Sequence, residues 1–472
     1  MNAPVTETTD ELHWLGVSGA ATAIANGDLS PVTLVTALLR RIERLDPELN
    51  AFIRIDGEAA LAAAKLAEAE ARAGRLRGPL HGVPVGIKDI IDVAGLPTTS
   101  HSKVLADSPP AKADAVCVER LRAAGAIVMG KLSTHEFAIG GPSFDLPWPP
   151  ARNPWNPGHH PGGSSSGSGA GVAAGFFPMA LGTDTGGSVR NPASCCGIVG
   201  MKATYGLVSR RGVFPLSFTL DHVGPMTRTV TDNALMLSVL AAHDPLDPGS
   251  AAPPHDRYLD ALDKGAQGIR IGFVRHFHER DVPAHPEVTA ALENVMRQLQ
   301  LAGADVRDVT LPSLTEFGAV NRVILQSEAW SIHAPWLRSR PGDYGKLARR
   351  RLMPGAFFGA GDYVTANRRR LEMIAEVNAV LEEVDVLLCA SSMDPACRID
   401  DPAEVERTYP RQARTPFNTT GHPAVAMMSG LSSNGLPLSV QFVGRYYDEA
   451  MLYRVARAWE QIAGMDKKRP PI

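Results

Sequence analysis

Residues 161–190 read P-G-G-S-S-S-G-S-G-A-G-V-A-A-G-F-F-P-M-A-L-G-T-D-T-G-G-S-V-R. The first part of this stretch gathers small residues and hydroxyl groups, and the last part places a second hydroxyl, that of Ser188, directly after two glycines. Glycine adopts backbone conformations that other residues resist and allows a ligand to approach the main chain closely. A serine in that setting can lie beside several free N–H groups. Acyl transfer requires such a nucleophile next to donors that hold a developing oxyanion.

Two other interpretations fit the same composition. A Gly/Ser-rich run is often a flexible linker, although a linker does not continue into an apolar segment such as residues 170–181 and then a second glycine pair. A phosphate-binding loop requires the order G-x-x-x-x-G-K-S/T, and no lysine follows these glycines. Composition alone therefore leaves catalysis as one of several alternatives.

Three motifs follow one another along the chain. Residues 82–89 read G-V-P-V-G-I-K-D, residues 162–168 read G-G-S-S-S-G-S, and residues 182–190 read G-T-D-T-G-G-S-V-R. In this order they resemble the lysine strand, the G-G-S-S-G-G-S run and the G-T-D-x-G-G-S-I/V-R run of the amidase signature family of serine hydrolases. Ser166 stands where that family usually has glycine. The resemblance extends from about residue 31 to about residue 461.

The resemblance implies a Ser–cis-Ser–Lys triad in place of Ser-His-Asp. In this triad Ser188 is the nucleophile, Ser164 follows a cis peptide bond and relays a proton, and neutral Lys88 is the base. Residues 80–91 form an apolar, β-branched run, which predicts a buried strand around that lysine. Burial disfavours the ammonium form and lowers the pKa of a lysine, whose free value of about 10.4 would keep it protonated.

A hydrogen-bonded loop around the nucleophile is also implied. The implied oxyanion donors are the backbone N–H groups of Thr185, Gly186, Gly187 and Ser188. Asp184 and Arg190, at either end of this loop, are predicted to hold it by hydrogen bonds.

Candidate substrate contacts lie before the nucleophile motif. The proline-rich segment 131–155 carries several aromatic residues, which favour a pocket wall as much as an ordinary packed loop. The resemblance adds a backbone contact to substrate about 26 residues before the cis-serine. The predicted substrate contacts are Ala138, Ile139, Phe144, Trp148 and Ser165.

The composition is ordinary for a globular protein. The 472 residues are 44% apolar and 21% charged, with a formal net charge of −3, which leaves no electrostatic footprint for nucleic acid. No apolar run is long enough for a transmembrane helix, and the polar, acidic start at residues 1–11 lacks the pattern of a signal peptide. We therefore expect a cytoplasmic protein that binds neither nucleic acid nor membrane.

No metal and no organic cofactor are predicted. The five cysteines have no regular spacing, which argues against a disulfide framework and fits a reducing compartment. The adjacent pair Cys195-Cys196 is interpreted as small buried residues beneath the site, because ligand spacing is missing. The pair His159-His160, between Gly158 and Pro161, is interpreted as part of a loop.

The periodicity of the chain indicates an α/β protein. Helices are predicted at about residues 31–45, 57–74, 114–125, 286–301, across most of 326–381, and at 448–462. Strands are predicted at 80–91, 126–130, 269–274, 306–311, 384–390, 424–428 and 438–443. The strand–helix–strand pattern over 269–311 favours a parallel pair. No linker or repeat is visible, so residues 1–472 are expected to form one domain with a catalytic core at about 75–225. The resemblance implies the amidase signature fold, a mixed central β-sheet covered by helices on both faces.

Two functions follow as hypotheses. The first is a stand-alone amidase that cleaves small neutral amides, anilides or carbamates, the last making it a urethanase, with apolar groups preferred over charged ones. The second is the A subunit of a glutamyl-tRNA amidotransferase, which releases ammonia from glutamine. The sequence around residues 207–216 and the absence of a basic excess favour the first. The oligomeric state stays open, although homodimers are common among relatives of this kind.

Overall fold

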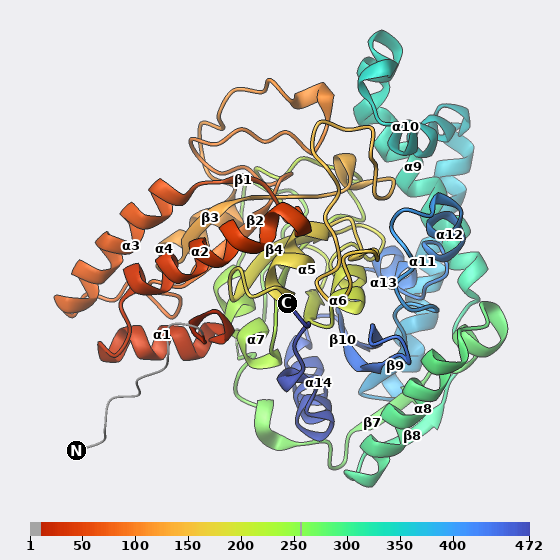
Figure 1. Cartoon of the computed structure of the whole chain (residues 1–472). Helices are drawn as coiled ribbons and strands as arrows, with labels where there is room; N and C mark the ends of the chain where they lie inside the picture. Colours follow the sequence, from red (N-terminus) through yellow and green to blue (C-terminus); the bar gives the residue numbers. More distant parts are fainter. Residues whose placement is uncertain (1–10, 255–256) are drawn as a thin grey trace.

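The computed structural model describes residues 11–254 and 257–472. Residues 1–10, where the sequence predicts no signal peptide, lie outside these ranges. Eleven strands in the described chain form one continuous sheet through the middle of the molecule (Figure 1). In spatial order they are β1 (Phe52–Ile55), β3 (Ile127–Leu132), β2 (Pro84–Lys88), β4 (Met179–Asp184), β6 (His222–Thr227), β5 (Val199–Lys202), β10 (Ala424–Leu431), β11 (Pro437–Gly444), β9 (Val386–Ala390), β7 (Arg270–Phe273) and β8 (Asp305–Asp308).

The sheet is mixed, as expected. Strand β2 runs parallel to both β3 and β4, and β7 runs parallel to both β8 and β9. The remaining neighbours, including the β10–β11 hairpin at the centre, are antiparallel. The parallel pair that the sequence predicted over 269–311 is confirmed, with a helix of the predicted bounds between its strands.

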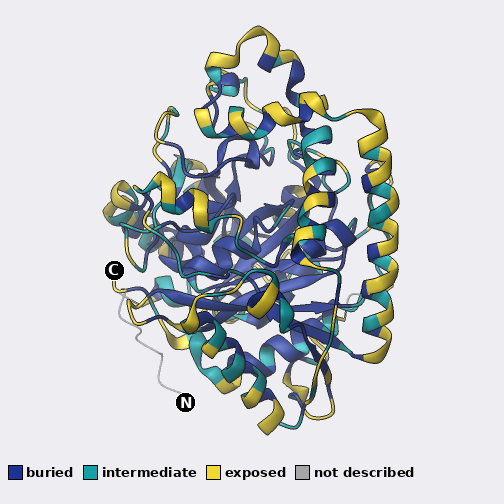
Figure 2. Cartoon of the chain, turned by 90° about the vertical axis from the view of Figure 1, so that its right-hand side faces the viewer, coloured by how far each residue is buried: buried dark blue, intermediate teal, exposed yellow. Residues whose placement is uncertain are grey.

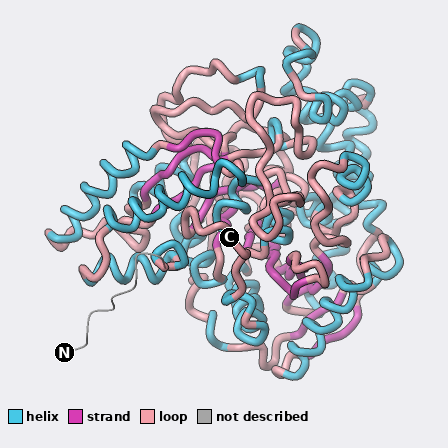
Figure 3. The backbone as a smooth tube through the Cα atoms, viewed as in Figure 1, coloured by secondary structure: helices cyan, strands magenta, loops and turns pink. Residues whose placement is uncertain are grey.

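Helices cover both faces of the sheet, which confirms the predicted fold class (Figure 3). The helices are α1 (Val17–Asn26), α2 (Pro31–Leu49), α3 (Gly57–Arg72), α4 (Val116–Ala123), α5 (Ser166–Ala173), α6 (Arg190–Cys196), α7 (Val230–Leu240), α8 (Pro286–Leu301), α9 (Leu314–Ser339), α10 (Lys346–Leu352), α11 (Ala360–Glu383), α12 (Pro402–Thr408), α13 (Thr415–Thr420) and α14 (Glu449–Ala463). Helices α5 and α6 pack directly on the central strands, α2 and α3 lie together at the end of the sheet formed by β1 and β3, and α8 lies beside β7 and β8 at the other end (Figure 1). Helices α9 and α11 pack against each other and against α13.

The amphipathic helices expose one side and bury the other, and the central strands of the sheet between them are buried (Figure 2). The segment that carries the sequence motifs, residues 161–184, is buried throughout. Glycine is required there by close packing: a Cβ on Gly167 would lie 2.2 Å from the carbonyl oxygen of Ala51, and one on Gly86 would lie 2.6 Å from Leu132. Small residues therefore let α5 pack closely against β2, the interior strand that carries the lysine.

Several predicted boundaries were wrong for local reasons. The strand predicted at 80–91 is limited to β2, because the chain turns immediately after Lys88 with the N–H groups of Ile90 and Ile91 donating to the Lys88 carbonyl. The helix predicted to end near residue 45 continues through Pro47 as α2 and ends at Asn50 in the left-handed conformation. Strand β3 extends beyond the predicted 126–130, so Lys131 lies in a strand and not in a loop. None of the helices in the described ranges has the length and apolar character needed to cross a membrane.

Candidate active site

The proposed lysine lies at the end of β2 and points into a cluster of hydroxyl groups. Lys88 Nζ donates hydrogen bonds to Ser164 Oγ at 2.8 Å, to Ser165 Oγ at 3.0 Å and to Thr183 Oγ1 at 2.7 Å. The side chain is fully buried. Burial lowers the pKa of Lys88 to about 7, against the opposing effect of Asp184 and Asp221, whose negative charges favour the ammonium form.

The serine motif forms a tight turn before α5. The peptide bond between Gly163 and Ser164 is cis, as expected. The preceding Gly162 has a φ of 80°, and a Cβ there would lie 2.6 Å from Pro192 of α6. Close packing against α6 therefore holds the hydroxyl of Ser164 beside Lys88.

Ser188 lies in the turn between β4 and α6. Its carbonyl oxygen accepts a hydrogen bond of 3.2 Å from the N–H of Ser165, so the two serine motifs are backbone neighbours. Within the described residues the Ser188 hydroxyl makes no hydrogen bond, and Ser188 lines a cleft together with Thr185 and Gly186. The structure thus joins Lys88 to Ser164 directly, whereas Ser188 is connected to them through the backbone of Ser165.

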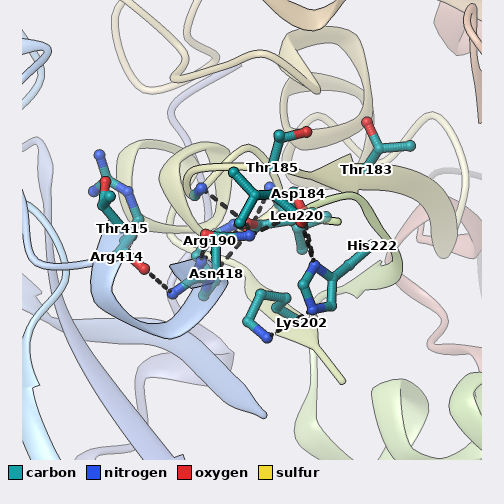
Figure 4. A network of polar contacts seen from close by, with 12 residues as sticks. Thr183, Asp184, Thr185, Arg190, Lys202, Leu220, His222, Arg414, Thr415 and Asn418 are labelled. Carbon is teal, nitrogen blue, oxygen red and sulfur yellow. Dashed lines mark hydrogen bonds and ion pairs between the residues drawn. The ribbon is translucent and has the colours of Figure 1, made fainter. Parts of the chain in front are cut away.

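The Asp184 side chain holds the turn that carries Ser188. Its carboxylate accepts from the N–H groups of Gly187 and Val189 at 2.8 and 3.1 Å, and it forms an ion pair of 2.9 Å with Arg190 (Figure 4). Both charged side chains are fully buried. Burial alone would raise the pKa of Asp184, but the Arg190 guanidinium and the hydrogen bond from Asn418 hold that pKa far below its ordinary value. The predicted role of Asp184 and Arg190 in holding the loop is confirmed.

The peptide between Asp184 and Thr185 is fixed from its carbonyl side. Asn418 Nδ2 lies 3.0 Å from the Asp184 carbonyl oxygen and His222 Nδ1 lies 3.2 Å from it (Figure 4). His222 Nδ1 also lies 2.7 Å from the carbonyl oxygen of Leu220. Both partners are acceptors, so Nδ1 carries the hydrogen. Because the carbonyl is held, the Thr185 N–H on the opposite side of the same peptide plane has a defined direction.

A second buried lysine fixes the tautomer of His222. Lys202 Nζ, on β5, donates to His222 Nε2 at 3.1 Å and to the carbonyl oxygen of Ala203 at 3.2 Å. Burial lowers the pKa of Lys202 far below its usual range. The pKa of His222 is also well below its usual value, because the imidazole is buried and lies next to Lys202. A neutral imidazole with its hydrogen on Nδ1 follows from these contacts.

Two cavities meet at the turn that carries Ser188. The first, of about 240 Å³, contains Ser188 and Gly186 in its wall and is called the catalytic cleft below. The second, of about 220 Å³, is lined mainly by apolar side chains and is called the apolar cavity; its apolar wall comprises Ile90, Val213, Phe214, Leu216, Phe218, Val223 and Leu246. Ala138, Thr185 and Leu216 line both cavities and therefore stand between them.

The predicted substrate contacts divide into two groups. Ala138 and Ile139 line the catalytic cleft, and Ala138 adopts the left-handed conformation with a φ of 60°. Ser165 is buried beneath the turn that carries Ser188, and its hydroxyl oxygen accepts a hydrogen bond from Lys88 Nζ. Phe144 is 57% exposed and lines a separate cavity, and Trp148 binds His101 through its carbonyl oxygen. The structure does not bring Phe144 and Trp148 into the wall of the catalytic cleft.

The paired cysteines are buried under the site as predicted, and the pair His159-His160 lies in a loop, also as predicted. Cys195 and Cys196 are buried in α6, and burial raises the pKa of Cys195 to about 12. His160 Nδ1 accepts a hydrogen bond from the N–H of Gly162 at 2.8 Å. In the described ranges His278, Glu279 and Glu293 are the one group whose spacing would suit a metal ion. Arg275 already pairs with both of those glutamates.

Several residues of the site escaped the sequence analysis. His222, Lys202 and Asn418 come from strands and a helix that follow the motifs by many residues, and the sheet order brings β5 and β6 beside β4. Local sequence offered one signal, the polar pair Asp221-His222 directly before an apolar run.

Comparisons with known proteins agree with this architecture. The family model described as Amidase matches residues 33–453. The A subunit of the glutamyl-tRNA(Gln) amidotransferase of Chloroflexus aggregans is 38% identical to this chain, covering 98% of it and 99% of the relative. The native peptide amidase of Stenotrophomonas maltophilia has a TM-score of 0.84 at 31% identity, with 99% of each chain covered. A structure from a vestigial protein complex, described as revealing the origins of an s-triazine catabolic enzyme, has a TM-score of 0.90 at 32% identity and covers 97% of this chain and 100% of its own.

These matches, the mixed sheet and the buried lysine–serine cluster define a hydrolase of the amidase class, which acts on carbon–nitrogen bonds. The chain belongs to the amidase signature family.

Proposed function

We propose that this protein is a stand-alone amidase that hydrolyses small amides, anilides or carbamates through an acyl-enzyme on Ser188. The observation that carries the proposal is Lys88, a fully buried lysine whose Nζ contacts three hydroxyl groups and whose pKa is lowered to about 7. A lysine in an ordinary surface position would stay protonated at neutral pH and could not accept a proton. Perturbed titratable groups in a cleft are typical of catalytic sites.

The proposed reaction starts when Ser188 Oγ attacks the carbonyl carbon. Its proton passes through the hydroxyl of Ser164 to neutral Lys88 Nζ, with which Ser164 already shares a hydrogen bond of 2.8 Å. The attack requires Ser188 Oγ to turn toward Ser164, and catalytic hydrogen bonds commonly tighten only when substrate is bound. Lys88 then returns the proton to the leaving amine, the C–N bond breaks, and water hydrolyses the ester on Ser188.

The oxyanion of the tetrahedral intermediate is proposed to accept hydrogen bonds from the backbone N–H groups of Thr185 and Gly186. Both residues line the catalytic cleft, and the Thr185 peptide is held by His222 and Asn418. Gly187 was also a candidate donor, but its single N–H donates to Asp184 at 2.8 Å. Carbamates pass through the same type of intermediate, so these groups serve carbamate and amide hydrolysis alike. A hydrolysis screen over amides, anilides, esters and carbamates tests the proposal.

Activity is expected to rise with pH around neutrality. The neutral form of Lys88 is the base, and its pKa of about 7 means that the deprotonated fraction grows as the pH passes through that value. We expect kcat/KM to increase from about pH 6 to about pH 8 and then level off into the alkaline range. Incubation with a chelator should leave this profile unchanged, because no step is assigned to a metal. An acid optimum with loss above neutrality would contradict the assignment of Lys88.

His222 is expected to affect the rate more than substrate binding. His222→Ala removes a donor to the Asp184 carbonyl, so the Thr185 N–H loses part of its fixed direction. Loss of a whole oxyanion donor costs roughly 3 kcal/mol, and we expect misdirection of one to lower kcat by about tenfold with a smaller change in KM. His222→Gln, which keeps a side-chain N–H, should recover part of kcat. A lower melting temperature without any rescue of kcat would indicate a purely structural role.

The second candidate function, the A subunit of a glutamyl-tRNA amidotransferase, is supported by the similarity to the relative from Chloroflexus aggregans. The chain purified alone separates the two functions. Hydrolysis of simple amides without added partner proteins favours the stand-alone amidase, and glutamine hydrolysis only with such partners favours the other.

A further inference from the structure

The catalytic cleft has an unusual charge distribution. Its wall carries two arginines, Arg322 from α9 and Arg351 from α10, and contains no aspartate or glutamate. The cleft residues with polar side chains besides these are Thr185, Ser188, Asn321, Gln326, Tyr409, Gln412 and Thr415. Cationic side chains without acidic partners make this a site for an anion.

Neither arginine is neutralised by another residue. Among the described residues Arg322 and Arg351 form no ion pair, and the Nε of Arg351 is buried without a hydrogen-bond partner. The Arg351 guanidinium lies 5.3 Å from the ring centroid of Tyr409, which keeps it beside the cleft. The adjacent Arg350 provides a contrast, since it pairs with Glu406 at 3.0 Å and does not belong to the cleft wall; it lines a neighbouring cavity to which Arg351 also contributes. A buried guanidinium N–H normally finds an acceptor, so Arg351 keeps unused hydrogen-bonding capacity beside the cleft.

The opposite end of the site is mainly apolar, and the two arginines in its wall, Arg210 and Arg211, are already paired with Asp247 and Asp244. The apolar cavity begins where Ala138, Thr185 and Leu216 separate it from the catalytic cleft. A bound amide that crosses this boundary therefore meets apolar side chains at one end and guanidinium groups at the other.

We infer that the substrate is an anionic amide, with an apolar group in the apolar cavity and a carboxylate that Arg322 and Arg351 hold in the catalytic cleft. This inference rests on the proposed amidase function. A guanidinium matches a carboxylate with parallel N–H donors, and such charge-assisted hydrogen bonds are stronger than neutral ones. The expectation of a wholly neutral substrate, drawn from the aromatic residues of segment 131–155, is revised at this end of the site.

The same cleft disfavours glutamine. Free glutamine carries an ammonium group next to its carboxylate, and the cleft wall offers no acidic side chain to that ammonium group. An ammonium ion between two arginines would be repelled, and a desolvated charge without a partner is costly. The preferred carboxylate is therefore one without a neighbouring amine, as in an N-acyl amino acid or the monoanilide of a dicarboxylic acid.

The test uses two substrate pairs in which only the charge changes. The first pair is N-hexanoylglycine and its primary amide, followed by hexanoate release. The second is glutaric acid monoanilide and its primary amide, followed by aniline release. For at least one pair we expect kcat/KM to be about tenfold higher for the acid, the scale of a charge-assisted hydrogen bond of about 1.4 kcal/mol or more.

Substitutions of the cleft arginines test whether they cause the preference for the acid over the amide. Arg351→Met should reduce the acid-to-amide ratio to about one, Arg351→Lys should restore part of it, and Arg322→Ala should lower it by a smaller factor. Arg350→Met is the matched control and should keep the wild-type ratio, because Arg350 is paired outside the cleft.

The outcomes are distinct. Equal kcat/KM for acid and amide in both pairs, or a ratio that survives Arg351→Met, overturns the carboxylate inference while amidase activity itself stands. Glutamine as a better substrate than both acids overturns the inference and favours the amidotransferase function. Absence of hydrolysis of every compound, together with no phosphonate labelling of Ser188, rejects the proposed function as well.

Discussion

Ser188→Ala is expected to lower kcat by about a million-fold and to abolish covalent labelling by a serine-directed phosphonate. The reason is that the ester intermediate forms on Ser188 Oγ, and no other hydroxyl in the cleft wall follows a pair of glycines with neighbouring N–H donors. Ser188 Oγ makes no hydrogen bond to another described residue, so its removal leaves no buried partner unpaired and should not change the melting temperature. Labelling is measured by intact mass after incubation with the phosphonate.

Ser194→Ala is a suitable control for this experiment. Ser194 lies on the following helix α6, and its hydroxyl donates to the carbonyl oxygen of Arg190 at 2.8 Å. This variant should still be labelled once per chain. A phosphonate adduct on any residue of the Ser188→Ala variant, or turnover at the wild-type rate, would reject Ser188 as the nucleophile.

The sequence was most informative where the site is local. Lys88, the cis-serine turn and the Gly186-Gly187-Ser188 turn each lie within one short motif, and their glycines report the close backbone packing that the structure contains. The buried strand around Lys88 was predictable from its apolar neighbours. Its length was not, because Ile90 and Ile91 are as apolar as the strand itself although the chain has already turned.

The rest of the site depends on contacts between distant segments. Asn418 reaches Asp184 from α13, and Arg351 reaches the cleft from α10, so neither position carries a local pattern that marks it. The basic character of the cleft is likewise invisible in a chain with a formal net charge of −3. Phe144 shows the opposite error: an aromatic residue near the motif in sequence is exposed at a different cavity.

Lys88→Met is expected to separate catalysis from folding more clearly than any other single change. Methionine keeps the unbranched apolar stem and removes the base, so we expect kcat to fall by at least about a thousand-fold. Burial of Lys88 lowers its pKa from 10.5 to about 7, which means that folding disfavours the ammonium form. That penalty is fully present below the folded pKa, decreases as the pH rises from about 7, and disappears above the unfolded value of 10.5.

At neutral pH Lys88→Met therefore removes a contribution on the order of 4 kcal/mol that lowers the free energy of unfolding. The variant also loses the hydrogen bonds to Ser164, Ser165 and Thr183, which stabilise the folded state by about 1 kcal/mol each and offset most of that gain. The net result should be a melting temperature that is unchanged or slightly higher in an enzyme that has lost its activity. Lys131→Met is the matched comparison, because Lys131 is equally buried but pairs with Asp89 at 3.0 Å. Leaving that carboxylate unpaired should destabilise the protein by about 3–5 kcal/mol while the folded fraction still turns over substrate. If Lys88→Met lowered the melting temperature as much as Lys131→Met and retained kcat, Lys88 would be a structural residue and the proton path through Ser164 would be wrong.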